Sequence, residues 1–403
     1  MKILIYGINY TPELTGIGKY SGELGSWLAN RRHEVRVITA PPYYPDWAIQ
    51  PPYKNRYFSE EINGVQVYRC PLYVPKSIST SKRLSHLFSF ALSSIPKVIA
   101  QFFWKPDVIF CVIPTMFYAP IALFLSKLSG AQFVLHIQDY EVDAMLGLGM
   151  TKPGFIGRIA KWYERRCLSS ADVISTISAS MMDKAITKGA IAEQLYFFPN
   201  WSNLESFLNV CSDRKNELLS RLNLPTDKKI CLYSGNIGEK QGLDVVLDAA
   251  TRLGSNALFV FCGQGSGLES LKKSVSEKEL TNVRFYPLQP LDDLPALLSI
   301  ADCHLVIQKK GVADAVLPSK LTNILAIGGQ AVITAEKGTE LEKLCTQYQG
   351  IAELIEPEKS DELVPAIQRV LTKNKFNPIA QNYAKTNLDK DTLLESFEEM
   401  LKS

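Results

Sequence analysis

A lysine in the first turn of a predicted helix is the residue best suited to phosphate chemistry. In the stretch Ala313–Ala335, Pro318 suits the first helical turn, and apolar residues recur at helical spacing up to Gly328. The backbone N–H groups at a helix N-terminus favour an anion, and Lys320 would add a full positive charge. An ordinary buried helix with a solvated lysine explains this pattern equally well, so the rest of the chain must decide.

Three loops in the second half of the chain could bring phosphate-binding groups to one place. Residues 235–242, 263–267 and 311–318 each follow a predicted strand and precede a predicted helix, and the first two are rich in glycine. In a parallel sheet such loops share one edge, where backbone N–H groups could bind a diphosphate. The lysines that could converge there are Lys240, Lys309, Lys310 and Lys320.

A histidine and two acids stand at the end of the strand predicted at Gln132–Ile137. His136 lies within the strand, and Asp139 and Glu141 follow it closely. Open α/β sheets bind ligands at the carboxyl ends of their strands, so this position favours a functional role. A lone histidine is usually structural, and His136 could equally cap the following loop.

Strands rich in Val, Ile and Leu alternate with helical patterns along the chain, which predicts an α/β fold with parallel sheets. The first unit of this pattern has strands at Lys2–Tyr6 and Glu34–Thr39 and a helix at Tyr20–Arg31, with Gly16 and Gly18 in the loop before the helix. A dinucleotide-binding turn needs GxGxxG directly after the first strand and an acid after the second. Neither is present, which disfavours a dehydrogenase.

The length and composition fit a two-domain protein. The chain has 403 residues, of which 46% are hydrophobic and 21% charged, as is typical of soluble, well-cored proteins. A net charge of +3 does not indicate nucleic-acid binding. No CxxC pair occurs among the 8 cysteines, and Met1–Gly7 is too short an apolar run for a signal peptide. We therefore expect a cytoplasmic protein with reduced thiols, and a hinge in the polar segment 201–227.

Two segments in the first half of the chain could interact with a membrane. Lys82–Lys105 is a predicted helical region in which basic residues alternate with aromatic and aliphatic ones, so it could lie on an anionic membrane surface. The alternative is a helix packed on its domain with the basic residues in solvent. Val108–Ser126 is uncharged over a length that could span a bilayer, but Pro114 and Pro120 divide it. We expect a buried strand followed by a helix rather than a transmembrane span.

Longer runs of the sequence resemble the family 4 retaining glycosyltransferases of the GT-B fold. These specific runs cover essentially the whole chain and comprise Tyr6–Tyr20, Val37–Pro45, His136–Gly147, Phe198–Trp201, Tyr233–Gly242 and Val316–Asn323. The resemblance implies two Rossmann-like domains facing a cleft, with the acceptor-binding domain at 1–205 and the nucleotide-sugar-binding domain at 206–385. It also implies a final helix, residues 386–403, that returns to the first domain.

The resemblance assigns roles to residues of both domains. His136 matches a histidine near the transferred sugar, and with Lys320 and Lys240 it forms the implied catalytic set. The residues implied in binding the sugar donor are Gly16, Gly18, Gly235, Asn236, Gly263, Gln264, Asp314, Ser319 and Asn323. Those implied in binding the acceptor are Tyr43, Tyr44 and Asp139.

Two departures from the family pattern concern the nucleotide. The family often has two glutamates eight positions apart, the second of which bonds the ribose, but Ala315 and Asn323 stand at these positions. Asn236 replaces the arginine of the usual glycine loop, and Lys240 is displaced by one position from the family's lysine. Asn323 could bond the ribose as a neutral donor and acceptor.

The resemblance implies a retaining, metal-independent hexosyltransferase without a cofactor, peripheral at the inner face of the membrane. Its expected partners are a nucleotide sugar such as GDP-fucose, a lipid-linked saccharide of colanic acid-like exopolysaccharide synthesis, and the inner-membrane surface, but not nucleic acid. Two alternatives remain. The missing glutamates motivate a non-catalytic nucleotide-sugar-binding partner of a polysaccharide complex, and the fold would also suit a sugar-nucleotide epimerase.

Overall fold

The chain folds into two compact α/β units. The computed structural model describes residues 1–13, 16–75, 79–114, 116–140, 155–238, 241–311 and 318–402. The first unit comprises Met1–Pro199 and Leu394–Ser403, and the second comprises Asn200–Leu393. The chain therefore leaves the first unit once and returns to it, so that unit is built from two separate segments.

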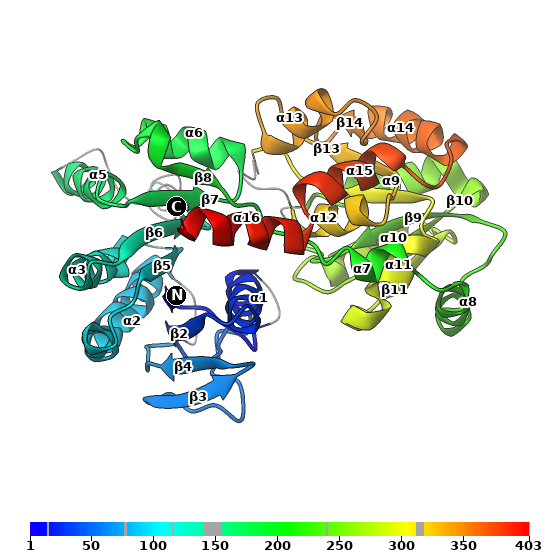
Figure 1. Ribbon diagram of the computed structural model, residues 1–403. Helices are drawn as coiled ribbons and strands as arrows, with labels where there is room; N and C mark the ends of the chain where they lie inside the picture. Colours follow the sequence, from blue (N-terminus) through cyan, green and yellow to red (C-terminus); the bar gives the residue numbers. More distant parts are fainter. Residues whose placement is uncertain are drawn as a thin grey trace. The chain divides into compact units, whose positions relative to one another are not determined.

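A mostly parallel sheet forms the centre of the first unit (Figure 1). Its described strands are β1 (Lys2–Tyr6), β2 (Glu34–Thr39), β3 (Phe58–Ile62), β4 (Val65–Arg69), β5 (Val108–Ile113), β6 (Gln132–Ile137), β7 (Val173–Thr176) and β8 (Leu195–Phe197). They are ordered β3-β4-β2-β1-β5-β6-β7-β8, and among them β3 and β4 are the antiparallel pair.

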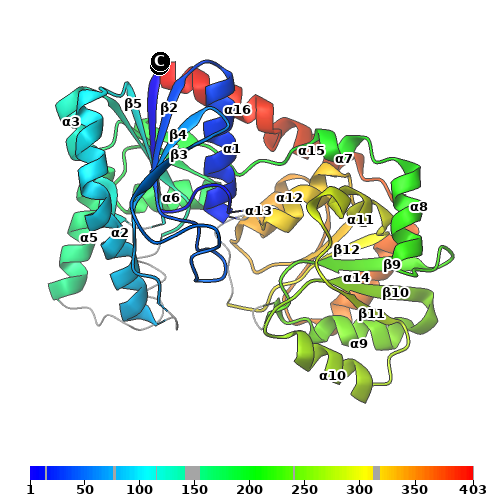
Figure 2. The ribbon, with the colours of Figure 1, turned by 90° about the horizontal axis from the view of Figure 1, so that it is seen from below.

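Helices lie on both faces of this sheet (Figure 2). One face carries α2 (Thr80–Ala100), α3 (Ala119–Ser129) and α5 (Phe155–Leu168), and the other carries α1 (Gly16–Asn30) and α16 (Lys390–Lys402). The remaining described helices of the unit are α6 (Ala179–Thr187), η1 (Gln101–Phe103), η2 (Met116–Tyr118) and η3 (Ala192–Gln194). Since helices cover both faces, a central strand such as β5 is buried along its whole length.

A hairpin closes one edge of the same sheet. Asn63-Gly64, a dipeptide typical of two-residue hairpin turns, joins β3 to β4, and the two residues have φ values of 51° and 77°. The sequence signal for an antiparallel pair is thus confirmed. Residues of β4 alternate between buried and partly buried, which directs Val65, Val67 and Arg69 to the core.

The second unit is built around a parallel sheet in the order β11-β10-β9-β12-β13-β14. Its described strands are β9 (Lys229–Ser234), β10 (Ala257–Cys262), β11 (Val283–Tyr286), β12 (Cys303–Val306), β13 (Ala331–Thr334) and β14 (Glu353–Ile355). Its described helices are α7 (Glu205–Leu208), α8 (Ser212–Arg221), α9 (Asp244–Leu253), η5 (Gly254–Asn256), α10 (Leu268–Glu277), η6 (Leu291–Asp293), α11 (Leu294–Ile300), α12 (Ser319–Ala326), α13 (Glu340–Gln347), α14 (Ser360–Thr372) and α15 (Pro378–Asn387). Alternate residues of β9 enter two apolar clusters, Ile230 and Leu232 on one face and Cys231 and Tyr233 on the other.

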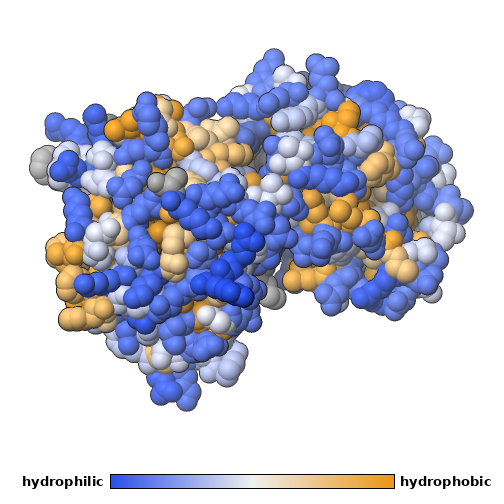
Figure 3. Space-filling view, in the orientation of Figure 1, coloured by the Kyte–Doolittle hydropathy of each residue, from blue (hydrophilic) through white to orange (hydrophobic). Residues whose placement is uncertain are grey.

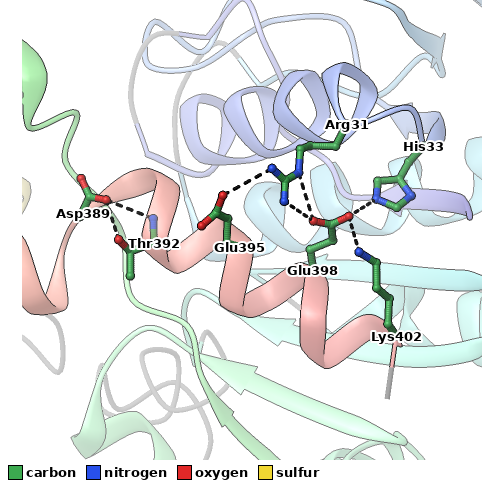
Figure 4. Close-up of polar contacts among 7 residues, drawn as sticks. All are labelled: Arg31, His33, Asp389, Thr392, Glu395, Glu398 and Lys402. Carbon is green, nitrogen blue, oxygen red and sulfur yellow. Dashed lines mark hydrogen bonds and ion pairs between the residues drawn. The ribbon is translucent and has the colours of Figure 1, made fainter.

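Helix α16 is anchored to the first unit by a buried carboxylate (Figure 4). Glu398 accepts hydrogen bonds from the side chains of Arg31 at 3.0 Å and Lys402 at 2.7 Å, and it lies 2.7 Å from His33 Nε2. Burial opposes ionisation of Glu398, but these three partners outweigh it and lower the pKa to about 2. The carboxylate is therefore charged at neutral pH and holds the helix against α1 and the start of β2.

Aromatic packing and a cap complete this anchor. Phe397 stacks on Phe198 with ring centroids 4.3 Å apart and contacts Phe110 at 5.1 Å. Asp389 accepts a hydrogen bond from the backbone N–H of Thr392 at 3.1 Å, which caps the first turn of α16. The helix begins at Lys390, after this cap, and not at residue 386 as predicted, because the residues up to Asn387 belong to α15.

The uncharged run Val108–Ser126 forms β5, η2 and most of α3. The division at its prolines into strand and helix is therefore confirmed. No helix in the described ranges is both long enough and apolar enough to cross a membrane.

Candidate functional site

Two glycine-rich loops of the second unit meet backbone to backbone. The N–H of Ile237 donates to the Gln264 carbonyl at 2.9 Å, which joins the loop after β9 to the loop after β10. A Cβ on Gly263 would come within 1.9 Å of the Gly235 carbonyl oxygen, and Gly265 has a φ of 152°. Residues with side chains do not fit at these two positions, so the glycines are needed for the close approach of the loops.

Lys320 lies beside this pair of loops. It is the second residue of α12, and Pro318 precedes the helix with a ψ of 133° instead of forming its first turn as predicted. The Lys320 ammonium lies 4.4 Å from the centroid of the Tyr233 ring, and its Cδ would be 3.8 Å from a Cβ on Gly235. The partly exposed cation and the start of α12 thus adjoin the loop after β9.

The loop after β12 adjoins the same place. The Lys309 side chain packs so closely on Gly242 that a Cβ there would lie 2.6 Å from Lys309 Cγ, while Lys310 is exposed. Because β12 and β10 both pair with β9, the segments that follow these three strands leave the sheet at one edge, although residues 239–240 and 312–317 of the predicted loops lie outside the described residues. The predicted site residues that lie outside the described residues are Lys240, Asp314 and the side chain of Ser319.

The polar side chains of this edge differ in their surroundings. Asn236 and Gln264 are exposed, so their side chains face solvent. Asn323 is partly buried, and its Oδ1 accepts a hydrogen bond at 3.0 Å from Ser202, which is 1% exposed. The structure thus gives Asn323 an intramolecular partner that the sequence did not indicate.

In the first unit, a buried carboxylate connects the loops after β1 and β2. Glu13 accepts hydrogen bonds from the backbone N–H groups of Tyr43 at 3.1 Å and Tyr44 at 3.0 Å, and from the Asn9 side chain at 2.8 Å. Burial raises the pKa of Glu13, and these hydrogen bonds oppose the rise. Glu13 therefore fixes the backbone of both tyrosines that the sequence assigns to acceptor binding.

Gly16 and Gly18 form the first turn of α1, and not the loop before it as predicted. A Cβ on Gly18 would lie 2.6 Å from the Cβ of Glu13. This glycine therefore makes room for a buried side chain of the protein. Gly16 has a φ of 59°, and no described atom lies near its Cβ position.

Arg69 joins the same two loops to the hairpin. Its side chain is fully buried and donates from Nε to the Glu60 carboxylate at 2.8 Å. Its two terminal nitrogens donate to the carbonyls of Ala40 at 2.9 Å and Thr11 at 2.5 Å. One buried cation thus supports the chain after β1, the chain after β2 and the edge strand β3.

An aromatic cluster supports the Tyr43 side chain. His86 of α2 is fully buried, and its ring centroid lies 4.6 Å from that of Tyr43 and 5.1 Å from that of Trp47. Its Nδ1 donates to the Tyr73 carbonyl at 2.6 Å, and burial lowers the pKa of the ring. The Tyr43 ring therefore packs against His86 inside the first unit, whereas the Tyr44 side chain is 40% exposed.

His136 is enclosed within the first unit. It is 3% exposed, its ring stacks on Phe110 at 5.1 Å, and its nitrogens lie 2.9 Å from Ser175 Oγ and 2.8 Å from the Gln138 amide nitrogen. Burial lowers the pKa of His136 to about 3, so the ring is neutral at physiological pH. This environment favours a structural role over direct contact with a sugar.

Asp139 is exposed at the edge that also carries Glu13 and Tyr43. The strands β2, β1, β5 and β6 are parallel neighbours, so the segments that follow them lie along one edge of the sheet. Tyr140, the next residue, turns inward and donates to the Met181 carbonyl at 2.9 Å. Glu141 lies outside the described residues.

Sequence reasoning missed Glu13, Arg69 and His86, although two of them leave a signal. Arg69 continues the alternation of Val65 and Val67, which places a charge on the buried face of a strand. Glu13 is the one acid in residues 7–22, between glycines and apolar residues. No pattern distinguishes His86 from other residues of its helix.

In the described ranges, no three His, Cys, Asp or Glu side chains cluster closely enough to hold a metal ion.

Two family models and a close relative match the chain. A Glycosyl transferase 4-like domain matches residues 15–201, and a domain of the Glycosyl transferases group 1 matches residues 214–387. A relative from Escherichia coli (strain K12), described as the putative colanic acid biosynthesis glycosyl transferase WcaI, is 56% identical over 401 residues. This similarity covers 98% of this chain and 98% of the relative.

Solved structures show the same fold at low sequence identity. Sucrose-phosphate synthase from Thermosynechococcus elongatus has a TM-score of 0.74 at 15% identity, covering 100% of this chain and 98% of that protein. Anabaena HepE in complex with UDP has a TM-score of 0.71 at 15% identity, covering 100% of both chains. These likenesses confirm the predicted GT-B class, with its two Rossmann-like units.

Proposed function

Because the chain belongs to the glycosyltransferase family in which a Glycosyl transferase 4-like domain precedes a group 1 domain, we propose that it transfers a sugar from a nucleotide sugar to a lipid-linked saccharide. The name of the 56% identical relative supports a place in exopolysaccharide synthesis of the colanic acid type. The resemblance of the sequence to the family supports GDP-fucose as the sugar donor and retention at the reacting carbon.

The observation that carries this proposal is the meeting of two glycine loops beside Lys320. A diphosphate is bound best by several backbone N–H groups at close range together with a positive charge. The loops at Gly235 and Gly263 bring the backbone together, and Lys320 adjoins them. HepE, which shares the fold, forms a complex with UDP. We assign the nucleotide of the sugar donor to this edge of the second unit.

We assign the predicted site residues to three tasks in the proposed reaction, namely stabilising the leaving group, binding the sugar donor and binding the acceptor. Lys320, with Lys240, stabilises the departing diphosphate, because a fixed cation gains most where negative charge develops. Further contacts to the nucleotide sugar come from Gly235, Asn236, Gly263, Gln264, Asp314, Ser319 and Asn323 of the second unit. The acceptor is bound by Tyr43, Tyr44 and Asp139. His136 stabilises the folded first unit and takes no direct part in the transfer, since its ring is enclosed.

The proposed reaction uses no metal and no cofactor. Cations of the protein and backbone N–H groups carry the charge stabilisation that a divalent ion provides in other transferases. Turnover in a chelator such as EDTA should therefore equal turnover in its absence. A loss of activity that Mg²⁺ or Mn²⁺ restores would contradict this part of the proposal.

A panel of GDP- and UDP-sugars tests the function. The purified chain, incubated with each nucleotide sugar and no acceptor, should slowly release the nucleotide from one of them, with GDP-fucose as the expected substrate. Binding without release would favour a non-catalytic nucleotide-sugar-binding protein. Interconversion of the free nucleotide sugar, followed by NMR, would favour an epimerase. Addition of a lipid-linked saccharide should then accelerate release, and the product linkage shows whether the configuration is retained.

A further inference from the structure

Helix α2 is apolar on both of its faces. Phe90 and Val98 point into the first unit and are buried, whereas Phe88, Leu92 and Ile99 on the opposite face are 52%, 52% and 56% exposed. A helix at the surface of a water-soluble protein normally directs polar residues outward. The outer face of α2 is therefore suited to an environment less polar than water.

Neighbouring elements continue this apolar surface (Figure 3). Phe103 of η1 is 83% exposed, Phe124 of α3 is 62% exposed and Trp162 of α5 is 66% exposed. Helix α3 packs on α2, and Tyr163 of α5 donates to a carbonyl of η2 at 3.0 Å, so these elements are contiguous. We define the apolar face as Phe88, Leu92, Ile99, Phe102, Phe103, Phe117, Phe124, Leu128 and Trp162.

All of the apolar face except Trp162 lies in a strongly cationic part of the chain. Residues 62–138 contain seven lysines and arginines and one acid, Asp107, although the whole chain has a net charge of only +3. Asp107 lies near the η1 end of the apolar face, where its carboxylate accepts a hydrogen bond from the backbone N–H of Lys2 at 2.7 Å. Lys82 and Arg83 in the first turn of α2 and Lys127 of α3 are exposed. The apolar face is thus bordered by positive charge with almost no negative charge between.

We propose that the apolar face docks on the surface of an anionic lipid bilayer. Its aromatic and aliphatic side chains would enter the interface, and Lys82, Arg83 and Lys127 would contact the headgroups. Positive charge is complementary to anionic lipid. A second copy of this chain, placed symmetrically on the same face, would bring like charges together. Lys97 takes no part, because it lies over the Tyr68 ring at 5.5 Å.

This inference rests on the proposed function, since a lipid-linked acceptor must be met at the membrane. Helix α2 contributes both to the apolar face and to the support of the proposed acceptor-binding loop. Its outer face carries Phe88, and its inner face carries His86, whose ring contacts Tyr43 in the proposed acceptor-binding loop. Docking through α2 would therefore bring the acceptor-binding loop of the same unit close to the headgroup layer.

Flotation with vesicles tests the docking face. The full chain should float with vesicles of phosphatidylcholine and phosphatidylglycerol, and far less with phosphatidylcholine alone. Replacing Lys82, Arg83 and Lys127 together by glutamine should weaken binding on the order of 100-fold, because each cation near anionic lipid contributes about fivefold. The matched control replaces Lys272, Lys273 and Lys278 of the second unit, whose side chains are 45%, 77% and 44% exposed. It should bind as the unchanged chain does.

A second pair of variants tests the apolar contribution. Phe103→Ser with Phe124→Ser should weaken binding at least tenfold, since both rings lose contact with the interface. The matched control is Leu288→Ser with Leu291→Ser, two residues of the second unit that are 49% and 64% exposed. Melting temperatures of all variants should stay close to that of the unchanged chain, because the replaced side chains face outward.

Three outcomes would overturn the docking proposal. These are binding that does not depend on anionic lipid, binding that the face variants leave unchanged, and self-association in sedimentation velocity that the face variants abolish. Release of nucleotide from a sugar donor without vesicles keeps the two proposals separable. If that release persists while vesicle binding is absent, the docking proposal fails and the proposed function stands; vesicle binding without release on any sugar donor gives the opposite result.

Discussion

The two units build the sheet edges that carry their candidate site residues in different ways, one from backbone and the other from buried side chains. In the second unit, backbone meets backbone at Gly235 and Gly263, and one partly exposed lysine adjoins them. In the first unit, the loops are held from within by hydrogen bonds of the buried side chains of Glu13 and Arg69. A backbone-built edge depends on the absence of a Cβ, whereas a side-chain-built edge depends on a few polar groups whose loss leaves buried partners unsatisfied.

Because of this difference, we expect substitutions at the edge of the second unit to affect activity and substitutions of buried groups in the first unit to affect stability. Removing Lys320 takes a charge from a solvent-accessible edge, so it should affect turnover with little effect on folding. Removing a buried group of the first unit should destabilise that unit whatever its effect on turnover. Three substitutions, one in the second unit and two in the first, test the contrast.

The largest effect is expected for Arg69→Met. The Glu60 carboxylate and two carbonyls would lose their buried donor, so the free energy of unfolding should fall by about 3–5 kcal/mol. Urea denaturation of the purified variant measures this change. Arg56→Met, at an exposed position of the same segment, is the control and should change stability by roughly 0.5 kcal/mol at most. An Arg69 variant as stable as the control would show that the first unit does not rely on its buried charge.

Lys320→Ala should change activity and leave stability intact. Loss of one group that stabilises a leaving group typically reduces the rate on the order of ten- to a thousand-fold. Nucleotide release from the sugar donor measures this loss, and the melting temperature checks the fold. Lys337→Ala, at an exposed position of the same unit, should retain full turnover. A Lys320 variant with unchanged turnover would remove this lysine from the proposed site.

His136→Asn should have the smallest effect and act on stability. The ring packs on Phe110 and lies within hydrogen-bonding distance of Ser175 and Gln138, so its loss should lower the free energy of unfolding by roughly 1–3 kcal/mol. Turnover per folded molecule and GDP affinity should change little. A stable variant with strongly reduced turnover would instead place His136 at the reacting sugar.

The pH dependence of stability sharpens the test on His136. Its folded-state pKa of about 3 lies below the ordinary value of 6.5, so the unfolded chain binds the proton first. The histidine therefore costs stability progressively as the pH falls from about 6.5 to 3. The asparagine variant lacks this dependence, so the gap between the two proteins should narrow on acidification. A constant gap would mean that the pKa of His136 is the same in the folded and the unfolded protein.

Much of the fold follows from the sequence because strand and helix periodicity is local. The bounds of β1, β2 and β6 match the predicted strands Lys2–Tyr6, Glu34–Thr39 and Gln132–Ile137. The helix boundaries follow less closely, since caps and close packing decide them. Helix α1 begins at Gly16, before the predicted Tyr20, and its first turn packs against Glu13 through Gly18, whereas α16 begins at Lys390, directly after the cap at Asp389. Neither contact can be read from helical periodicity.

The candidate site divides in the same way. The glycine loops of the second unit are visible in the sequence, because glycine marks a backbone requirement directly. The supports of the first unit are not, because Glu13, Arg69 and His86 act through contacts with residues far away in the chain. The environment of His136 was beyond prediction for the same reason, since Phe110 and Ser175 come from neighbouring strands.

The return of α16 to the first unit has a consequence for the order of synthesis. Phe397 stacks on Phe198 and contacts Phe110, and Glu398 binds Arg31, yet residues 397 and 398 leave the ribosome only after the whole second unit has been made. Until α16 has been synthesised, the first unit therefore lacks part of its packing, and some of its apolar surface stays exposed while the second unit folds. The first unit is thus synthesised before the second for the most part, yet it completes its core after the second unit has been made.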